Sequence, residues 1–316
     1  MLGRIIEING ANRHLAVSRG FMTVAANDTE LGRVPLDDIA VVLANARGLT
    51  YTNRLLVELA GRGGVFVICA ANHRPVAWLW PLSGHHAQGA RLVQQAAAPK
   101  PLRKRLWRDI VVSKLGFQAA ALEACGEEGG GVAGLARKVR VGDPDNLEAQ
   151  GARRYWPLIF GSDFRRDRGA GGVNGLLNYG YTVLRAAMAR AVVSAGLHPT
   201  LGLHHGNRTN DMALVDDLME PFRPLVDLTV RGLVDGGVVE VEPVAKRQLA
   251  AVTVNDLVGE RGVTPLMTAL HRLAGSLAVA FEQGGGRLDL PTPPSLLELR
   301  RWMVFEPEAH TGGGAL

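Results

Sequence analysis

The feature that constrains the fold most is a change in the spacing of apolar residues near Pro81. Before this proline, short runs rich in apolar and β-branched residues are separated by turn residues, as in GRIIEI, HLAVS and VFVICAA, which is the pattern of β-strands. After it, apolar residues recur at helical spacing over long segments such as VNGLLNYGYTVLRAAMARAVVSAG. The sequence therefore predicts an α+β fold, in which a small N-terminal β-rich domain precedes a larger all-α C-terminal domain.

The same change sets the expected domain boundaries. Residues 1–80 are predicted to form the β-rich domain, residues 81–90 (PLSGHHAQGA) a linker, and residues 91–305 the helical domain. The final segment 306–316, EPEAHTGGGAL, is expected to be a flexible tail, as glycine-rich chain ends commonly are.

Composition places the chain among folded proteins without a membrane span. Hydrophobic residues make up 47% and charged residues 21%, which are ordinary values for a globular protein. No apolar run reaches the roughly 20 residues that a bilayer span needs, and MLGRIIEING lacks a signal-peptide pattern. The two cysteines, Cys69 and Cys125, have no metal-ligand spacing. We therefore expect a reduced, cytoplasmic protein that does not bind membranes.

Positive charge is concentrated in the central third of the chain. Residues 91–168 hold 15 Lys and Arg against 9 Asp and Glu, a net charge of +6, whereas the remainder holds 20 against 21. The clusters are Arg103–Arg105, Arg137–Arg140, Arg153–Arg154 and Arg165–Arg168. Such an excess suits a polyphosphate-binding surface, and a set of solvated helix faces explains it equally well.

Carboxylates interrupt an apolar segment near residue 217. In ALVDDLMEPF, Asp217 and Glu220 are three residues apart and share one face of a helix, whereas Asp216 points elsewhere. Pro221 predicts a kink or restart of that helix. Two carboxylates in apolar surroundings are costly to ionise without a compensating cation. A divalent metal would compensate, with an imidazole from His204 or His205 of the upstream pair.

The commoner explanation for two carboxylates at this spacing is an ordinary ion pair. Arg223 and Arg208 lie close enough in sequence to pair with Asp217 and Glu220 on a solvated helix face. Periodicity alone favours an ion pair over a metal site. The neighbouring histidines make a metal site more plausible, but the ion pair remains the favoured explanation.

Two segments resemble the signature of the CRISPR-associated integrase, the larger subunit of the spacer-acquisition complex. They are GLHHGNRTNDMALVDDLMEPFRPLVD and GDPDNLEAQGARRYWPLIFG, at 202–227 and 142–161. Other segments, such as VPLDDIAVVLAN and PVAWLWPLSGHHAQGARLVQQ, resemble the family in the same order, so that the resemblance covers roughly residues 1–300. DLMEPFRPLVD is most similar to the branch associated with type II systems.

The resemblance implies a set of metal ligands. By motif, Glu148 is the first ligand, His205 the second and Glu220 the third, with Asp217 as an acidic companion that is a further candidate ligand. One imidazole with two or three carboxylates and no thiolate suits Mg²⁺ or Mn²⁺, whereas zinc more often recruits cysteine or further histidines. The catalytic residues implied are therefore Glu148, His205 and Glu220, within the helical domain.

The resemblance also implies an activity in antiviral defence. The 3′-OH end of a captured DNA fragment, the spacer, attacks a phosphodiester at a CRISPR repeat boundary, and with water as the attacker the same centre is an endonuclease. Candidate DNA-binding residues share a position near the motifs: Arg153, Arg154, Asn178, Tyr179 and Tyr181. For each of these five, packing or solvated charge is an equally good explanation.

The partners implied by the family are double-stranded DNA, a second copy of the chain and a small ferredoxin-like CRISPR-associated subunit. Two homodimers, paired through their β-rich domains, flank a dimer of that subunit in a heterohexamer, and the RNA-guided effector nuclease is a further candidate partner. The alternative function is a non-catalytic DNA-binding scaffold of the same complex. A third possible function is a metal-dependent hydrolase of small phosphate esters, but this function does not explain the basic clusters.

Overall fold

The computed structural model describes residues 3–70, 75–204, 209–259 and 262–305. Its contacts divide the chain into two compact units, one within Met1–His86 and the other within Ala87–Glu308. The predicted tail, 306–316, lies outside the described residues.

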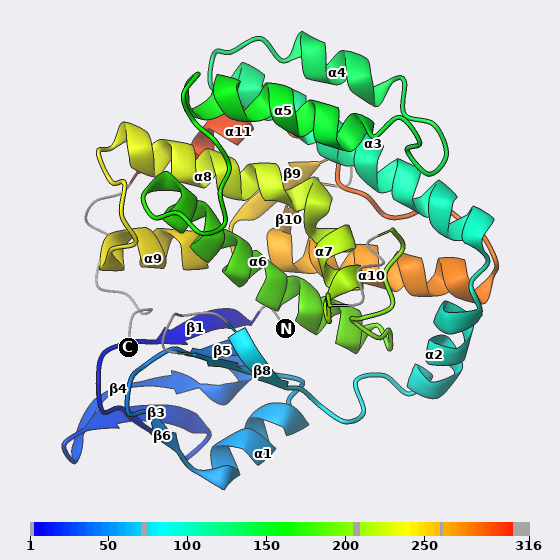
Figure 1. Cartoon of the computed structure of the whole chain (residues 1–316). Coiled ribbons are helices and arrows are strands. Elements are labelled where there is room, and N and C mark those ends of the chain that lie inside the picture. The colour runs from blue at the N-terminus through cyan, green and yellow to red at the C-terminus, as the bar shows by residue number, and fades with distance from the viewer. Residues whose placement is uncertain (1–2, 71–74, 205–208, 260–261, 306–316) are drawn as a thin grey trace. The chain divides into compact units, whose positions relative to one another are not determined.

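The first unit is built from two four-stranded sheets (Figure 1). Parallel strands β1, β5 and β7 and the antiparallel edge strand β8 form one sheet, and β4, β3, β2 and β6 form the other. The elements are β1 Arg4–Ile8, β2 His14–Ser18, β3 Phe21–Ala26, β4 Thr29–Pro35, η1 Leu36–Asp38, β5 Ile39–Ala44, β6 Thr50–Tyr51, α1 Asn53–Gly61, β7 Val65–Cys69 and β8 Pro75–Leu79.

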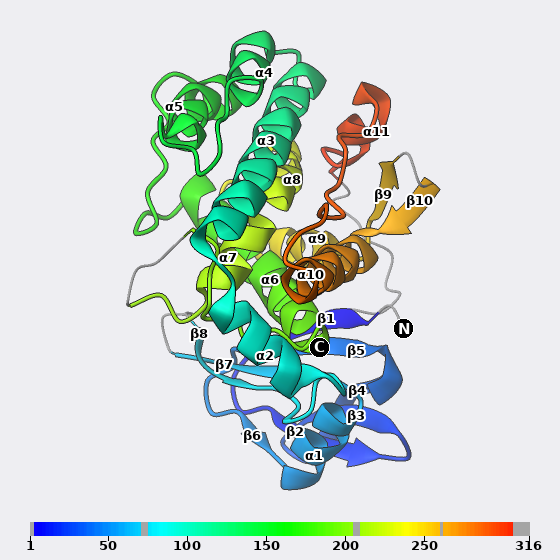
Figure 2. The ribbon, with the colours of Figure 1, turned by 90° about the vertical axis from the view of Figure 1, so that its right-hand side faces the viewer.

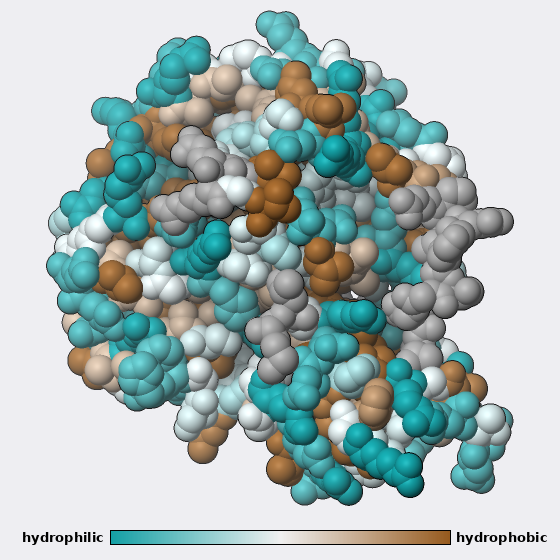
Figure 3. Space-filling model, turned by 180° about the vertical axis from the view of Figure 1, so that it is seen from behind, coloured by the Kyte–Doolittle hydropathy of each residue, from teal (hydrophilic) through white to brown (hydrophobic). Residues whose placement is uncertain are grey.

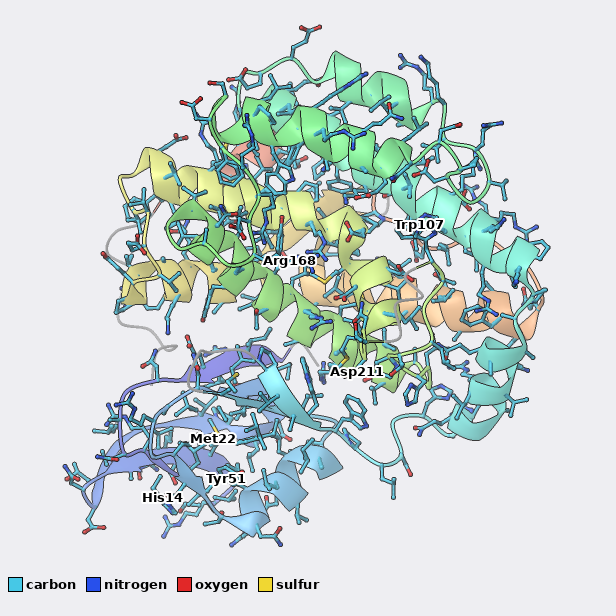
Figure 4. The ribbon with its side chains drawn as sticks, viewed as in Figure 1. His14, Met22, Tyr51, Trp107, Arg168 and Asp211 are labelled. Atoms are coloured by element: carbon cyan, nitrogen blue, oxygen red, sulfur yellow. The ribbon has the colours of Figure 1, made fainter. Side chains whose placement is uncertain are left out.

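One apolar cluster joins both sheets and α1. Ile8 from the first sheet, Leu15 and Met22 from the second and Leu59 from α1 are all fully buried in it; Met22 is marked in Figure 4. Burial of each large apolar side chain contributes about 1.5–3 kcal/mol. The two sheets and α1 therefore share one core, which fits the β-rich unit predicted from the sequence.

The second unit is mainly helical (Figures 1 and 2). Its helices are α2 Gln88–Ala97, α3 Lys100–Ala124, α4 Gly130–Ala136, α5 Leu147–Phe160, α6 Val173–Ser194, α7 Ala213–Met219, η2 Glu220–Phe222, α8 Arg223–Asp235, α9 Pro243–Ala251, α10 Leu266–Glu282 and α11 Leu296–Arg301. The two longest, α3 and α6, are central: α3 packs against α4, α5, α8, α11 and η2, and α6 packs against α7, α8, α9 and α10. The predicted α+β fold is confirmed.

The expectation of an all-α second part needs one correction. β9 Asp256–Gly259 and β10 Gly262–Pro265 pair as an antiparallel hairpin within it. Each strand has only four residues, too few for the alternation of apolar and polar residues to stand out from the helical pattern around it.

Helices α3 and α5 approach each other closely at Gly151. A Cβ atom added to Gly151 on α5 would lie 2.2 Å from Leu115 Cδ2 on α3, so only glycine permits the observed packing. Glu148 precedes Gly151 by three residues and therefore shares its helix face. The absent side chain brings that face against α3 where Lys114 and Leu115 lie.

Exposed apolar residues are scattered. Figure 3 shows them mostly singly or in small groups among hydrophilic residues on the face that it displays, which is ordinary for a globular surface. Among the described helices, none is both long enough and apolar enough to cross a bilayer.

Candidate active site

Glu148 is fixed at the start of α5 by a side-chain cap. The Leu147 and Glu148 amides donate hydrogen bonds to the two carboxylate oxygens of Asp143, at 2.8 and 3.0 Å. Asp143 and Asn146 both adopt positive φ, at 47° and 51°, a conformation that Asp and Asn tolerate better than most residues. The segment GDPDN thus folds into a tight turn that ends at the helix and presents Glu148 in its first turn.

Glu220 sits at a break between two helices. α7 ends at Met219, a single 3₁₀ turn covers Glu220–Phe222, and α8 begins at Arg223. The interruption predicted from Pro221 is therefore confirmed, and its cause is the missing amide hydrogen and the bulk of the proline ring. Glu220 is only 7% exposed, so its carboxylate faces the protein interior.

A buried lysine joins the two glutamates. Lys114 on α3 is 6% exposed, and its Nζ pairs with Glu148 Oε1 and, at 2.5 Å, with Glu220 Oε2. Arg223 Nε donates to the other oxygen, Glu220 Oε1, at 2.9 Å. The structure thus brings together two of the predicted ligands, from α5 and η2, on one shared ammonium group.

The electrostatics keep both cations charged. Burial is the largest influence on the pKa of Lys114 and lowers it, but Glu220 and Glu148 together raise that pKa above its ordinary value. For Arg223, burial again acts to lower the pKa, but Glu220, Tyr181 and Asp216 together raise that pKa above its ordinary value. The buried Lys114 and Glu220 and the partly exposed Arg223 and Glu148 therefore form a group of two cations and two anions. The ion pair expected with Arg223 is present, but in the interior and not on a solvated face.

Asp217 fixes the backbone at Leu203 and His204, just before the predicted ligand His205. This completely buried carboxylate accepts hydrogen bonds through Oδ2 from the amides of Leu203 and His204, at 2.6 and 3.0 Å. The His204 ring stacks on Trp107 of α3, the residue marked in Figure 4, with 4.5 Å between ring centroids and 3° between planes. The predicted ligand His205 lies outside the described residues.

Asp216 points away from this cluster, as predicted. Its two oxygens accept from Arg185 Nε and Nη2 on α6, at 2.7 and 2.8 Å. The Asn210 side-chain amide donates to the same carboxylate at 2.9 Å. Asp216 therefore fastens the start of α7 to α6.

The donors that the structure brings together fit a hard divalent cation. Glu148 and Glu220 each bring a carboxylate oxygen to the same ammonium group, and neither cysteine is among the partners of this cluster in the described part of the site. Carboxylates of this kind are what Mg²⁺ and Mn²⁺ favour. Within the described ranges no group of three or more His, Cys, Asp or Glu side chains is placed to hold a metal.

The candidate DNA-binding residues have different surroundings. Arg153 and Arg154 are exposed on α5, where Arg154 Nη1 donates to the Gly131 carbonyl at 3.1 Å. Asn178 on α6 accepts from Arg166 Nη2 at 2.6 Å and donates to the carbonyl of Arg168, marked in Figure 4, at 3.1 Å. The half-buried Tyr179 has the Lys246 ammonium 5.6 Å from its ring centroid.

Tyr181, the fifth candidate, belongs to a buried network. Its hydroxyl and that of Tyr155 both donate to Asp227 on α8, the latter at 3.0 Å. The Arg223 and Arg166 guanidinium carbons lie 4.6 and 5.5 Å from the Tyr181 ring centroid. The ring is 9% exposed, so in this arrangement it packs inside the protein, where no base can stack on it. Burial raises the pKa of Asp227 to about 7, although the hydrogen bonds from Tyr181 and Tyr155 lower it.

Sequence reasoning missed three residues that build this site. They are Lys114, the capping Asp143 and Asp227. Of the three, only Lys114 could have been found from the sequence. It is the one basic residue in the largely apolar segment DIVVSKLGF, which indicates a position on the buried side of α3.

Comparison with known proteins gives a consistent result. The family described as "CRISPR associated protein Cas1" matches residues 6–258. The CRISPR-associated endonuclease Cas1 of Neisseria meningitidis serogroup C (strain 8013) is 35% identical over 283 residues, covering 88% of this chain and 92% of the relative.

Two solved structures share the fold. A casposase bound to an integration product has a TM-score of 0.78 at 18% identity, covering 95% of this chain and 98% of that chain. A chain of a Cas6-RT-Cas1–Cas2 complex has a TM-score of 0.72 at 17% identity, covering 92% of this chain and 36% of that chain. The family match over most of the sequence, with the Neisseria relative covered almost completely, makes this chain a member of the CRISPR-associated Cas1 family.

Proposed function

We propose that this chain is a divalent-metal-dependent DNA integrase and endonuclease that inserts captured foreign DNA fragments into a CRISPR array. The observation that carries the proposal is the convergence of Glu148 and Glu220, 72 residues apart in sequence, on one buried position. Membership of the Cas1 family supports it, as do the names of the endonuclease relative and of the casposase bound to an integration product.

In this proposal Glu148, Glu220 and His205 hold Mg²⁺ or Mn²⁺, and Asp217 orients the segment that carries His205 by accepting from the Leu203 and His204 amides. When bound, the metal supplies Lewis-acid polarisation of a phosphoryl oxygen and acidifies the attacking hydroxyl.

The bond changes need no covalent protein intermediate. The 3′-oxygen of the captured fragment forms a new bond to phosphorus, the bond from phosphorus to the leaving 3′-oxygen of the repeat breaks, and the attacking hydroxyl's proton passes through solvent to the leaving oxygen. Negative charge grows on the phosphoryl oxygens, so the nearby cations Lys114 and Arg223 would stabilise the transition state more than the ground state. With water as the attacker, the same arrangement cleaves DNA.

The partners follow from the same family. We propose double-stranded DNA as substrate, homodimerisation through the β-rich unit and a ferredoxin-like Cas2-type subunit in a heterohexamer. The basic central third of the chain supports DNA as substrate, and the similarity to a chain of a Cas2-containing complex supports the Cas2-type subunit. Assignment to the type II-like branch, and with it contact to an RNA-guided effector nuclease, rests on the resemblance of DLMEPFRPLVD alone.

A non-catalytic DNA-binding scaffold is the second candidate function. It is favoured by the net charge of +6 over residues 91–168 and by the exposed Arg153 and Arg154. A scaffold binds duplex DNA in chelator and transfers no strand with either metal.

The test is strand transfer of a 3′-OH duplex into a repeat-containing plasmid. Glu148→Gln, Glu220→Gln and His205→Ala are each expected to lower the rate at least 100-fold while duplex binding changes less than threefold. Glu128→Gln, an exposed carboxylate, is the matched control and should keep full activity. Full activity in all three site variants would contradict the metal-dependent mechanism.

A further inference from the structure

The two predicted carboxylate ligands already have cationic partners. Lys114 pairs with both glutamates and Arg223 pairs with Glu220. The two negative charges of the pair are thus matched by two positive charges on side chains that are themselves buried or nearly so. A dication that enters here meets a neutral cluster and not a negative one.

A metal ion that binds both glutamates has to displace the Lys114 ammonium. Its ammonium contacts one oxygen of each glutamate and so lies in the space between them. Arg223 contacts the other oxygen of Glu220 from the same helical segment and can remain there. The lysine has a flexible stem of four carbons, so its charge can withdraw from the carboxylates without movement of α3.

A withdrawn ammonium needs a new anion. Water reaches Lys114 poorly, because only 6% of the residue is exposed, and an unpaired buried charge is unfavourable. A phosphodiester oxygen of bound DNA is an anion of suitable size for both the dication and the ammonium. Each phosphodiester carries one negative charge, so bound DNA offsets part of the positive charge that the metal adds to the cluster.

We propose that Lys114 couples metal binding to DNA binding: it occupies the Glu148–Glu220 pair when DNA is absent and transfers to a DNA phosphate when the metal enters. This inference rests on the proposed function, and it makes Lys114 a positioning residue for metal and phosphate. It predicts weak metal binding by the free protein and tighter binding by the DNA complex.

The experiment measures Mn²⁺ binding from the electron paramagnetic resonance signal of free Mn²⁺. The full-length protein is titrated with and without a saturating duplex that ends in 3′-deoxy nucleotides and cannot react, and Mn²⁺ bound by duplex alone is subtracted. For the wild type we expect the Kd for Mn²⁺ to fall at least tenfold when duplex is present. An unchanged Kd overturns the proposal without reference to any variant.

Lys114→Met tests the residue itself. Methionine keeps much of the volume and removes the charge, so Mn²⁺ should bind at least tenfold more tightly without DNA, and the effect of duplex should fall below threefold. Lys114→Arg retains the charge and should keep most of the coupling. Lys104→Met, an exposed lysine on the same helix, is the control and should match the wild type. A Lys114→Met protein with wild-type Kd values in both conditions overturns the proposal.

Two further variants separate this inference from the proposed function. If Glu148→Gln and Glu220→Gln leave Mn²⁺ binding unchanged, the ligand assignment fails, and both proposals fail with it. If they weaken Mn²⁺ binding at least tenfold while Lys114→Met has no effect, only the coupling role of Lys114 fails. If Lys114→Met does not fold, Lys114→Arg and the wild-type titrations still decide between coupling and its absence.

Discussion

The ring of His204 lies flat on the indole of Trp107, with 4.5 Å between the ring centroids. Trp107 is 2% exposed on α3, so His204 rests on a side chain that is itself packed in the core. The stack and the two hydrogen bonds to Asp217 fix the same point of the chain from two sides.

Replacement of this indole should both destabilise the protein and slow strand transfer. Trp107→Leu removes the stacking face and leaves a partial cavity, so we expect a loss of about 2 kcal/mol in the free energy of unfolding and at least tenfold slower strand transfer. Trp107→Phe keeps an aromatic face and should retain more activity at similar stability. Urea unfolding and strand-transfer rates measure both effects, and equal activity in the two variants would show that the stack has no role.

Asp217→Asn should loosen the loop with almost no change in volume. The neutral amide is a weaker acceptor than a carboxylate, which is expected to cost about 1–3 kcal/mol. The Leu203 and His204 amides should therefore exchange hydrogen faster, as measured by hydrogen–deuterium exchange. Asp211→Asn, at an exposed position of the same loop marked in Figure 4, is the control. Unchanged protection of both amides in Asp217→Asn would contradict the structural role assigned here.

Asp227 should make stability depend on pH. Burial raises its pKa to about 7 in the folded chain, above the usual value near 3.9 in an unfolded chain. Because the folded state holds the proton more tightly, the contribution of Asp227 to stability is fully present below about pH 4 and is lost as pH rises to about 7. The loss is on the order of 4 kcal/mol.

Asp227→Asn isolates that contribution, since asparagine does not titrate. The stability of the wild type relative to this variant, from urea unfolding at several pH values, should fall between pH 4 and pH 7. A constant difference over that range would mean that the carboxyl group is not protonated in the folded protein at pH 5.

Gly151→Ala should disturb α5 and with it Glu148. The new methyl group would lie 2.2 Å from Leu115 Cδ2, and relief of that overlap is expected to cost about 1–3 kcal/mol and to slow strand transfer. Gly131→Ala on α4 faces open space and should be neutral or stabilising by about 0.5–1 kcal/mol. Leu115→Ala added to Gly151→Ala should restore part of the activity, and a failure of Gly151→Ala to affect the rate would remove this packing from the account of the site.

Local sequence pattern was sufficient for the larger features of the fold. Strand-like runs before Pro81 and helical periodicity after it predicted the α+β class, and Pro221 predicted the break at Glu220. Those features depend on neighbours within a few residues, which is the range over which periodicity and proline geometry act.

The parts of the site that the sequence left open depend on contacts between distant residues. Lys114 precedes Glu148 by 34 positions and Glu220 by 106, and nothing in local spacing relates three such positions. Tyr181 was considered for DNA because an aromatic residue near a motif can stack on bases, but the choice between that role and packing depends on Asp227, Arg166 and Arg223, which approach it from other elements.

The ammonium bridge between α5 and η2 also bears on how this lineage can change. Because Lys114 joins the two segments through ion pairs of the chain itself, their attachment does not require an inorganic ion. A descendant that lost the proposed ligand His205 would therefore keep both ion pairs of this bridge. If the proposed function holds, an integrase and an inert scaffold of this fold differ by a single substitution at that position, with the same helices still joined by Lys114.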